Sequence, residues 1–177
     1  AIDRPETNVS LAEMTQVAIS VLQGDNKDQG KHKKYKNRFN RNNSNGFFLM
    51  VEGGKIDWAC HANDAMAAIG DTLAFDDAVG VALEFYKKHP NDTLIIVTGD
   101  HETGGMTIGH ATTAYSAYYD KLLRQTNSFV YFNQNVLPEL TCQGSLSNDL
   151  AMLDKIDEMF GLVYSDLNDY QKEKLDD

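Results

Sequence analysis

The stretch Phe47-Phe48-Leu49-Met50-Val51-Glu52-Gly53-Gly54 decides the fold that we expect for this chain. Its first five residues are all apolar, which is typical of a strand buried on both faces. A second apolar run, Leu94-Ile95-Ile96-Val97, leads into Thr98-Gly99-Asp100-His101. Helical patterns lie between the runs, over residues 56–69 and 71–88, with Asp71 as the expected cap of the second helix. This strand–helix–strand order predicts an α/β fold with a mostly parallel sheet flanked by helices.

Helical patterns also lie on both sides of this unit. Ser10 and Glu13 have the spacing of a capping box, followed by an apolar stripe from Leu11 to Leu22. Beyond Gly105, helices are expected over residues 115–125, 129–137, 148–160 and 166–175, with Ser147 and Ser165 at N-cap positions. We therefore divide the chain into a core at 1–109, with a basic loop insertion at 25–45, and a mainly helical appendage at 110–177.

The composition excludes several classes of protein. The chain has 177 residues, a net charge of −10 and 24% charged residues, as expected for a soluble globular domain. An acidic chain argues against a nucleic-acid binder, although residues 25–45 hold seven basic and two acidic side chains. We interpret that segment as a solvated loop and keep a polyanion-binding arm as the alternative. No apolar run reaches the roughly 18–20 residues of a transmembrane helix.

Cys60 and Cys142 form neither a redox motif nor a zinc-finger spacing. The sequence leaves open whether they form a disulfide or remain two thiols.

Metal-ligand side chains follow both apolar runs: Glu52, Asp57 and His61 after the first, and Asp100 and His101 after the second. Asp57 and His61 are four residues apart, which places them on one face of a helix, where a carboxylate and an imidazole can share Zn²⁺. Taken singly, each residue has an ordinary structural explanation, such as a helix cap or a surface turn. Together they favour a metal cluster, because burying so many charges without cations is very costly. Glu102 and Thr103 are placed to orient the ligands, whereas His32 and His89 lie elsewhere and His110 is a weak candidate.

Two stretches are specific enough to indicate a family. Residues 46–61 and 98–105 resemble bacterial alkaline phosphatases, as do Asp76-Asp77-Ala78-Val79 and the helix start Leu11-Ala12-Glu13-Met14-Thr15. The resemblance runs from about residue 10 to residue 108. It implies that the predicted sheet is part of an alkaline-phosphatase-like sandwich.

The resemblance also implies roles for the candidate residues. Glu52 would bind Mg²⁺, Asp57 and His61 the first Zn²⁺, and Asp100 and His101 the second Zn²⁺. The family hydrolyses phosphate monoesters through a phosphoserine, with the two zinc ions holding the attacking and leaving oxygens. The family's serine nucleophile, its phosphate-binding arginine and its last zinc histidine have no counterpart in these residues. We therefore expect these residues to be a carboxyl-side piece of a longer enzyme. The piece has no catalytic residue of its own, and alone we expect it to be inactive and to bind metal weakly or not at all.

Other functions stay open. A phosphodiesterase, sulfatase or phosphomutase of the same superfamily would share Asp-His ligands at strand ends, and the polyanion-binding module is a more distant alternative. The resemblance implies a small phosphate monoester as substrate, a periplasmic or extracytoplasmic location and compatibility with a homodimer. It implies no nucleic-acid partner.

Overall fold

The computed structural model describes residues 1–23, 46–106, 114–142, 144 and 149–176. These residues pack as two compact units. The first unit is formed by Ala1–Pro5, Gly54–Asp71 and Asp100–Asp177, and the second by Glu6–Gly53 and Thr72–Gly99. The predicted boundary at residue 109 and the basic segment at 25–45 lie outside the described residues, so the predicted division into core and appendage stays a prediction.

In the second unit, α1 (Leu11–Gln23) begins at the predicted capping box. The Ser10 backbone N–H donates to Glu13 Oε2 at 2.7 Å, and the Glu13 N–H donates to Ser10 Oγ at 3.1 Å. These reciprocal bonds satisfy two of the N–H groups that a helix start leaves without partners. The capping-box prediction is confirmed.

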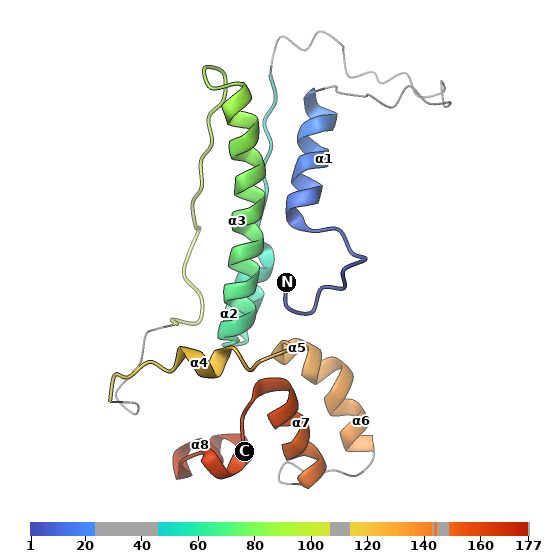
Figure 1. The fold of residues 1–177 in the computed structure, drawn as a ribbon, viewed down its shortest axis with the longest axis vertical. Coiled ribbons are helices and arrows are strands. Elements are labelled where there is room, and N and C mark those ends of the chain that lie inside the picture. Colours follow the sequence, from blue (N-terminus) through green and yellow to red (C-terminus); the bar gives the residue numbers. More distant parts are fainter. Residues whose placement is uncertain (24–45, 107–113, 143, 145–148, 177) are drawn as a thin grey trace. The chain divides into compact units, whose positions relative to one another are not determined.

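The predicted sheet is wrong for the described residues, which contain no strand. Residues 46–53 and 93–99 are drawn as coil in Figure 1. Their apolar side chains are not buried: Phe48 is 88% exposed, and Leu94 is 83% exposed. A strand acquires its hydrogen bonds and its burial from neighbouring strands. Within the part of the chain that the structure describes, the apolar runs meet no such neighbours, so the segments predicted as buried strands are extended chain with no buried apolar side chain.

The two helices predicted between these runs are present, but they divide at a different residue. α2 covers Gly54–His61, and α3 runs without a break over Ala65–Lys88. The cap of α3 is Asp64, whose Oδ1 accepts from the Ala67 N–H at 3.0 Å. Asp71 lies inside α3 and pairs with the Ala1 amine. The prediction placed Asp64 inside a helix over residues 56–69, so it missed the break between His61 and Ala65 and the cap at Asp64.

The carboxyl-terminal part of the first unit is helical (Figure 1). Its elements are α4 (Tyr119–Leu122), α5 (Phe129–Tyr131), the π-helical segment η2 (Phe132–Val136), α6 (Leu137–Cys142), α7 (Leu150–Phe160), the short 3-10 helix η3 (Tyr164–Asp166) and α8 (Asp169–Asp176). Asp149 caps α7, and Gly161 ends it with φ +66°. Asn168 caps α8 in a reciprocal pair with Gln171, so Ser165 is not the cap, and Ser147 lies outside the described residues.

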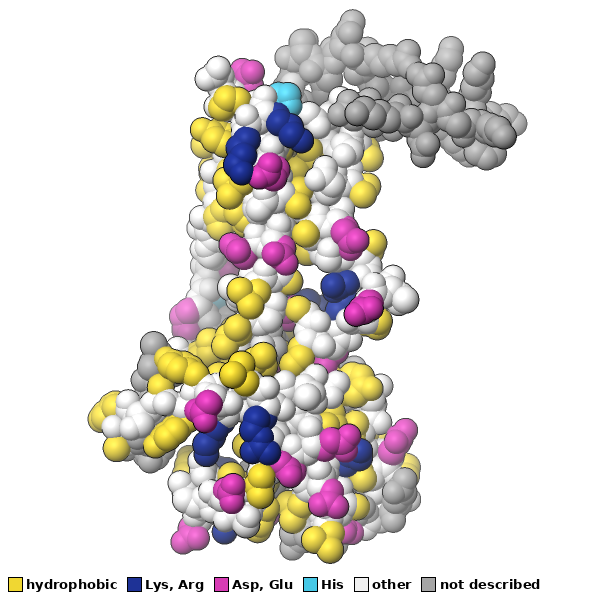
Figure 2. All heavy atoms as spheres, in the orientation of Figure 1, with side chains coloured by type: hydrophobic (Ala, Val, Ile, Leu, Met, Phe, Trp, Pro, Cys, Tyr) yellow, Lys and Arg dark blue, Asp and Glu magenta, His cyan; other side chains and the backbone are white. Residues whose placement is uncertain are grey.

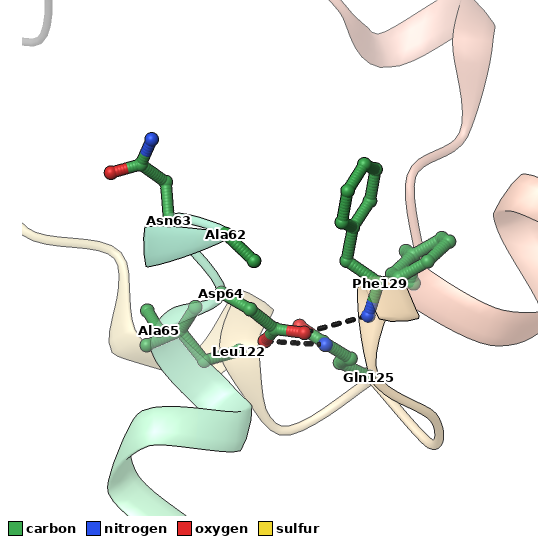
Figure 3. A pocket seen from close by; sticks show the side chains of 8 residues that line it. Ala62, Asn63, Asp64, Ala65, Leu122, Gln125 and Phe129 are labelled. Carbon is green, nitrogen blue, oxygen red and sulfur yellow. Dashed lines mark hydrogen bonds between the residues drawn. The ribbon is translucent and has the colours of Figure 1, made fainter. Parts of the chain in front are cut away.

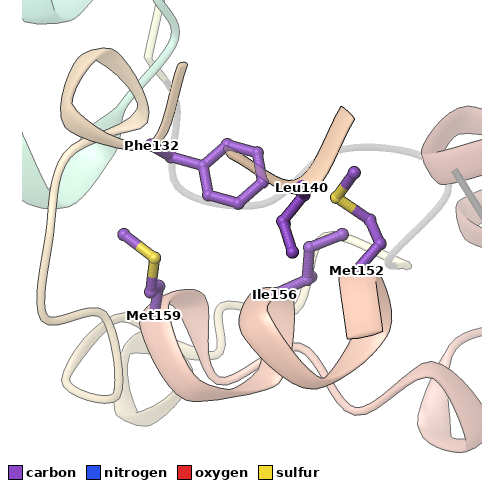
Figure 4. Packing of buried hydrophobic residues seen from close by; sticks show 5 residues of the cluster. All are labelled: Phe132, Leu140, Met152, Ile156 and Met159. Carbon is purple, nitrogen blue, oxygen red and sulfur yellow. The ribbon is translucent and has the colours of Figure 1, made fainter. Parts of the chain in front are cut away.

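A small apolar core holds these helices together. It is formed by Phe132, Leu140, Met152, Ile156 and Met159 (Figure 4). Three of the five residues lie on α7 at the spacing of one helix face. Elsewhere apolar side chains reach the surface, as Figure 2 shows for one face. Val17, Val21 and Leu73 in the second unit are examples of exposed apolar side chains. Among the described residues, no helix combines the length and the apolar character needed to cross a bilayer.

Candidate metal centre

Asp57 and His61 lie together on α2, as their spacing predicts. His61 Nε2 is 3.5 Å from Asp57 Oδ1, and the His61 side chain is 70% exposed. Both side chains therefore offer donor atoms on one face of a short helix.

The second pair of candidates, Asp100 and His101, lies on the segment that enters the first unit at residue 100. The His101 backbone N–H donates to Asp100 Oδ1 at 3.1 Å, and His101 Nε2 is 3.5 Å from Asp100 Oδ2. The Asp100 side chain is 90% exposed, so its carboxylate remains open to a cation.

Thr103 joins the two pairs. Its hydroxyl donates to Asp57 Oδ1 at 2.9 Å and lies 3.0 Å from His101 Nδ1. His101 Nδ1 is also 3.1 Å from the backbone oxygen of Glu102, which can only accept. His101 Nδ1 therefore carries a proton, and in the neutral ring the lone pair is on Nε2. This is the tautomer that a metal-binding histidine needs when its other nitrogen is held by the protein.

The electrostatic surroundings of His101 favour its protonated form. The hydrogen bond to the Glu102 backbone oxygen is the main cause of a raised pKa, and the carboxylates of Asp100, Asp57 and Glu102 act in the same direction. The same negative surroundings favour any cation placed beside the ring.

The remaining predicted residues are placed differently. Glu52 belongs to the second unit and is exposed. Glu102 contacts His101 through its backbone oxygen. Among the described residues, no group of three or more His, Cys, Asp or Glu side chains is arranged to hold one metal ion. The donor chemistry of each Asp–His pair fits Zn²⁺, but each pair offers two ligands where zinc sites usually have three or four. Cys60 and Cys142 are free thiols.

Gly104 was not singled out by the sequence patterns, yet its backbone fits closely against α2. A Cβ built there would lie 2.4 Å from the Cys60 backbone oxygen and 3.1 Å from Asn63 Oδ1. Gly104 also has φ +77°, in the region that disfavours other residues. Only glycine lets the segment carrying His101 and Thr103 pass so close to the end of α2. The pair Gly104-Gly105 was the available sequence signal.

A pocket of about 240 Å³ lies beside the turn between α2 and α3 (Figure 3). Its lining is apolar apart from Asn63, Asp64 and Gln125. Asp64 is buried there, and the sequence analysis did not single it out, since it lies within the helix predicted over residues 56–69.

Comparison with known proteins decides the family. The sequence model of the alkaline phosphatases matches residues 1–173. The chain belongs to the alkaline phosphatase family. The resemblance read from residues 46–61 and 98–105 is thus confirmed.

Several members of this family are similar to the chain over much of its length. Alkaline phosphatase 4 of Bacillus subtilis is 43% identical over 109 residues, which is 62% of this chain and 20% of the relative. The repressible alkaline phosphatase of Saccharomyces cerevisiae is 36% identical over 142 residues, or 77% of this chain and 23% of the relative. The streptomycin-6-phosphate phosphatase of Streptomyces griseus is 40% identical over 109 residues, or 62% and 20%. No solved structure gives a significant match.

The chain spans about a fifth of the length of these curated relatives. Members of this family are generally metal-dependent phosphatases.

Proposed function

We propose that these residues form part of the metal site of an enzyme that hydrolyses phosphate monoesters, with the serine nucleophile supplied by polypeptide outside the 177 residues. The observation that carries the proposal is the chain of hydrogen bonds from Asp57 through Thr103 to His101. It links two predicted ligand pairs that are far apart in the sequence. The family supports phosphate-ester chemistry, and the name of the Streptomyces griseus relative specifies a phosphate monoester.

Under this proposal, Asp57 and His61 bind one Zn²⁺, Asp100 and His101 bind a second, and Glu52 binds Mg²⁺. When bound, such metal ions stabilise charge on the phosphate oxygens and lower the pKa of the attacking hydroxyl or water. Thr103 keeps Asp57 Oδ1 oriented and holds the proton of His101 on Nδ1, which leaves Nε2 for the metal.

The shortage of ligands predicts how these residues behave alone. Two protein ligands per zinc are fewer than stable zinc sites provide. The 177-residue chain should therefore bind Zn²⁺ weakly and release no phosphate from 4-nitrophenyl phosphate. We also propose an extracytoplasmic location, by analogy with the bacterial relatives.

The decisive experiment uses a longer chain that contains these residues together with the remaining length of the relatives. With Zn²⁺ and Mg²⁺ present, it should hydrolyse 4-nitrophenyl phosphate in preference to bis-(4-nitrophenyl) phosphate and 4-nitrophenyl sulfate. His101→Gln should lower kcat/KM strongly, whereas Asp77→Asn, a change at an exposed position on α3, should not. Preference for the diester or the sulfate would replace the proposal with one of the related activities.

A further inference from the structure

Asp64 takes part in the motif that ends α2 and also caps the start of α3. Its backbone N–H donates to the Ala59 oxygen at 3.0 Å, and the Asn63 N–H donates to the Cys60 oxygen at 3.0 Å. Asn63 has φ +53°, so the three features together form a Schellman motif that ends α2. The Asp64 carboxylate then caps α3 through the Ala67 N–H. One residue thus fixes how α2 leads into α3.

The same carboxylate reaches the helices that follow residue 118. Oδ1 accepts from Gln125 Nε2 at 2.8 Å, and Oδ2 accepts from the Phe129 backbone N–H at 2.7 Å (Figure 3). Phe129 opens α5, where the backbone N–H has no partner within the helix. Asp64 is 7% exposed, so these bonds offset the cost of burying its carboxylate.

The surroundings of Asp64 strengthen this contact. Leu122, Phe129 and Phe160 line the neighbouring pocket with apolar surface. Hydrogen bonds are stronger where water is scarce, and an unmatched polar group costs more there. A helix cap alone requires only the bond to Ala67, so the bonds to Gln125 and Phe129 need another explanation.

The end of α2 in turn contacts the segment that carries His101. Gly104 lies against the Cys60 backbone oxygen and the Asn63 side chain. A continuous path of contacts therefore runs from Phe129 through Asp64 and the α2 terminus to Gly104 and Thr103. The path ends at Thr103, which contacts Asp57 and His101, one residue from each half of the candidate metal centre.

We propose that Asp64 is a positioning residue that clamps the carboxyl-terminal helices to the end of α2, and so holds Asp57 and His61 in place against Thr103 and His101. The consequence for zinc rests on the proposed function, whereas the positioning itself does not. The helical part of the first unit is then a support for the metal centre rather than a separate appendage.

The test separates the clamp from the helix cap by two substitutions. Asp64→Ser keeps a good cap for α3, but its hydroxyl is too short to reach Gln125 and Phe129. Asp64→Asn also caps, but its NH₂ group must face one of the N–H donors. Asp154→Asn, an exposed position on α7, is the matched control for loss of a carboxylate.

The first measurement is NMR of the metal-free 177-residue chain. Both Asp64 variants should shift the ring signals of His61 and His101, and should speed amide exchange at Asn63 about tenfold, the effect of losing roughly one hydrogen bond. Far-UV circular dichroism should match the wild type. Gln125→Ala removes the hydrogen bond from Gln125 Nε2 to Asp64 Oδ1 but keeps the Asp64 carboxylate. It should shift the ring signals of His61 and His101 less than the Asp64 variants do, so the test remains usable if those variants unfold.

The second measurement is a titration with Zn²⁺ alone. The dissociation constant should rise about tenfold in both Asp64 variants, as for other residues that orient metal ligands, and stay unchanged in Asp154→Asn. Wild-type ring signals, exchange and affinity in Asp64→Ser would show that Asp64 is only a cap and overturn the proposal. If the wild-type chain binds no Zn²⁺, as two protein ligands per ion allow, the ring signals and amide exchange decide the positioning role by themselves, and the longer chain tests the metal sites.

Discussion

Thr103 Oγ1 lies 2.9 Å from Asp57 Oδ1, although 46 residues separate them in sequence. This contact links the helix that carries Asp57 and His61 to the segment that carries Asp100 and His101. The candidate metal centre therefore depends on a neutral hydroxyl as well as on its charged residues.

Replacing the Thr103 hydroxyl by a methyl group should weaken the link between Asp57 and His101 without creating a cavity. Thr103→Val keeps the shape of the side chain but leaves Asp57 Oδ1 and His101 Nδ1 each with one hydrogen bond fewer. A net loss of about 1 kcal/mol in the free energy of unfolding follows from a partly exposed bond of this kind. Urea denaturation measures this loss, and Thr103→Ser, which keeps the hydroxyl, is the control. Equal stability of the valine and serine variants would contradict a role for the bond.

Gly104 should be intolerant of any side chain. Gly104→Ala places a Cβ against the Cys60 backbone oxygen at a residue with φ +77°, so the segment must move away from α2. A loss of about 2 kcal/mol is expected from the strain of that backbone conformation and the displaced contact. Gly99→Ala is the matched control, because a Cβ there meets no atom within 4 Å. Thermal unfolding of the two variants compares them directly, and similar melting temperatures would contradict the close approach.

The sequence predicted local features of this molecule better than its long-range pairing. Ser10 and Glu13 specify their capping box within four residues, and Asp57 and His61 share a helix face by spacing alone. The sheet depended on partners that periodicity does not supply. The apolar runs at 47–51 and 94–97 are the patterns of buried strands, but the described residues offer them no neighbouring strand.

The roles of Gly104 and Asp64 could not be predicted from the sequence, for a related reason. Both depend on contacts with residues distant in the chain, Cys60 for Gly104 and Phe129 for Asp64. A glycine after a metal-ligand motif and an aspartate before a helix each have an ordinary local explanation. Only their three-dimensional neighbours show that the glycine permits a close approach and that the carboxylate is buried with three N–H donors.

The stability of the carboxyl-terminal helices should be sensitive to substitutions on the buried face of α7. Ile156 is buried against Phe132 and Leu140, so Ile156→Ala leaves a cavity in a small cluster. A destabilisation of about 2–3 kcal/mol is expected from lost burial and the residual cavity. Leu150→Ala, on the same helix but 76% exposed, should change the free energy of unfolding by less than about 0.5 kcal/mol. Chemical denaturation followed by circular dichroism gives both values, and equal losses would place the core elsewhere.

The hydrogen bond between Tyr164 and Asp176 should make the stability of the carboxyl-terminal segment depend on pH. The Tyr164 phenol donates to Asp176 Oδ2 at 2.8 Å, and this bond, followed by desolvation and the negative charge of the carboxylate, raises the pKa of Tyr164 above 10. Because the folded pKa exceeds the unfolded one, the stability that the bond provides is complete below pH 10 and is lost as pH rises through the folded pKa. Asp176→Asn should return the pKa of Tyr164 toward that of an ordinary tyrosine, as followed by the NMR shifts of its ring. Asp169→Asn, at the other end of α8, should leave the titration unchanged. If instead Asp169→Asn lowers the pKa as much as Asp176→Asn does, general charge rather than the hydrogen bond controls Tyr164.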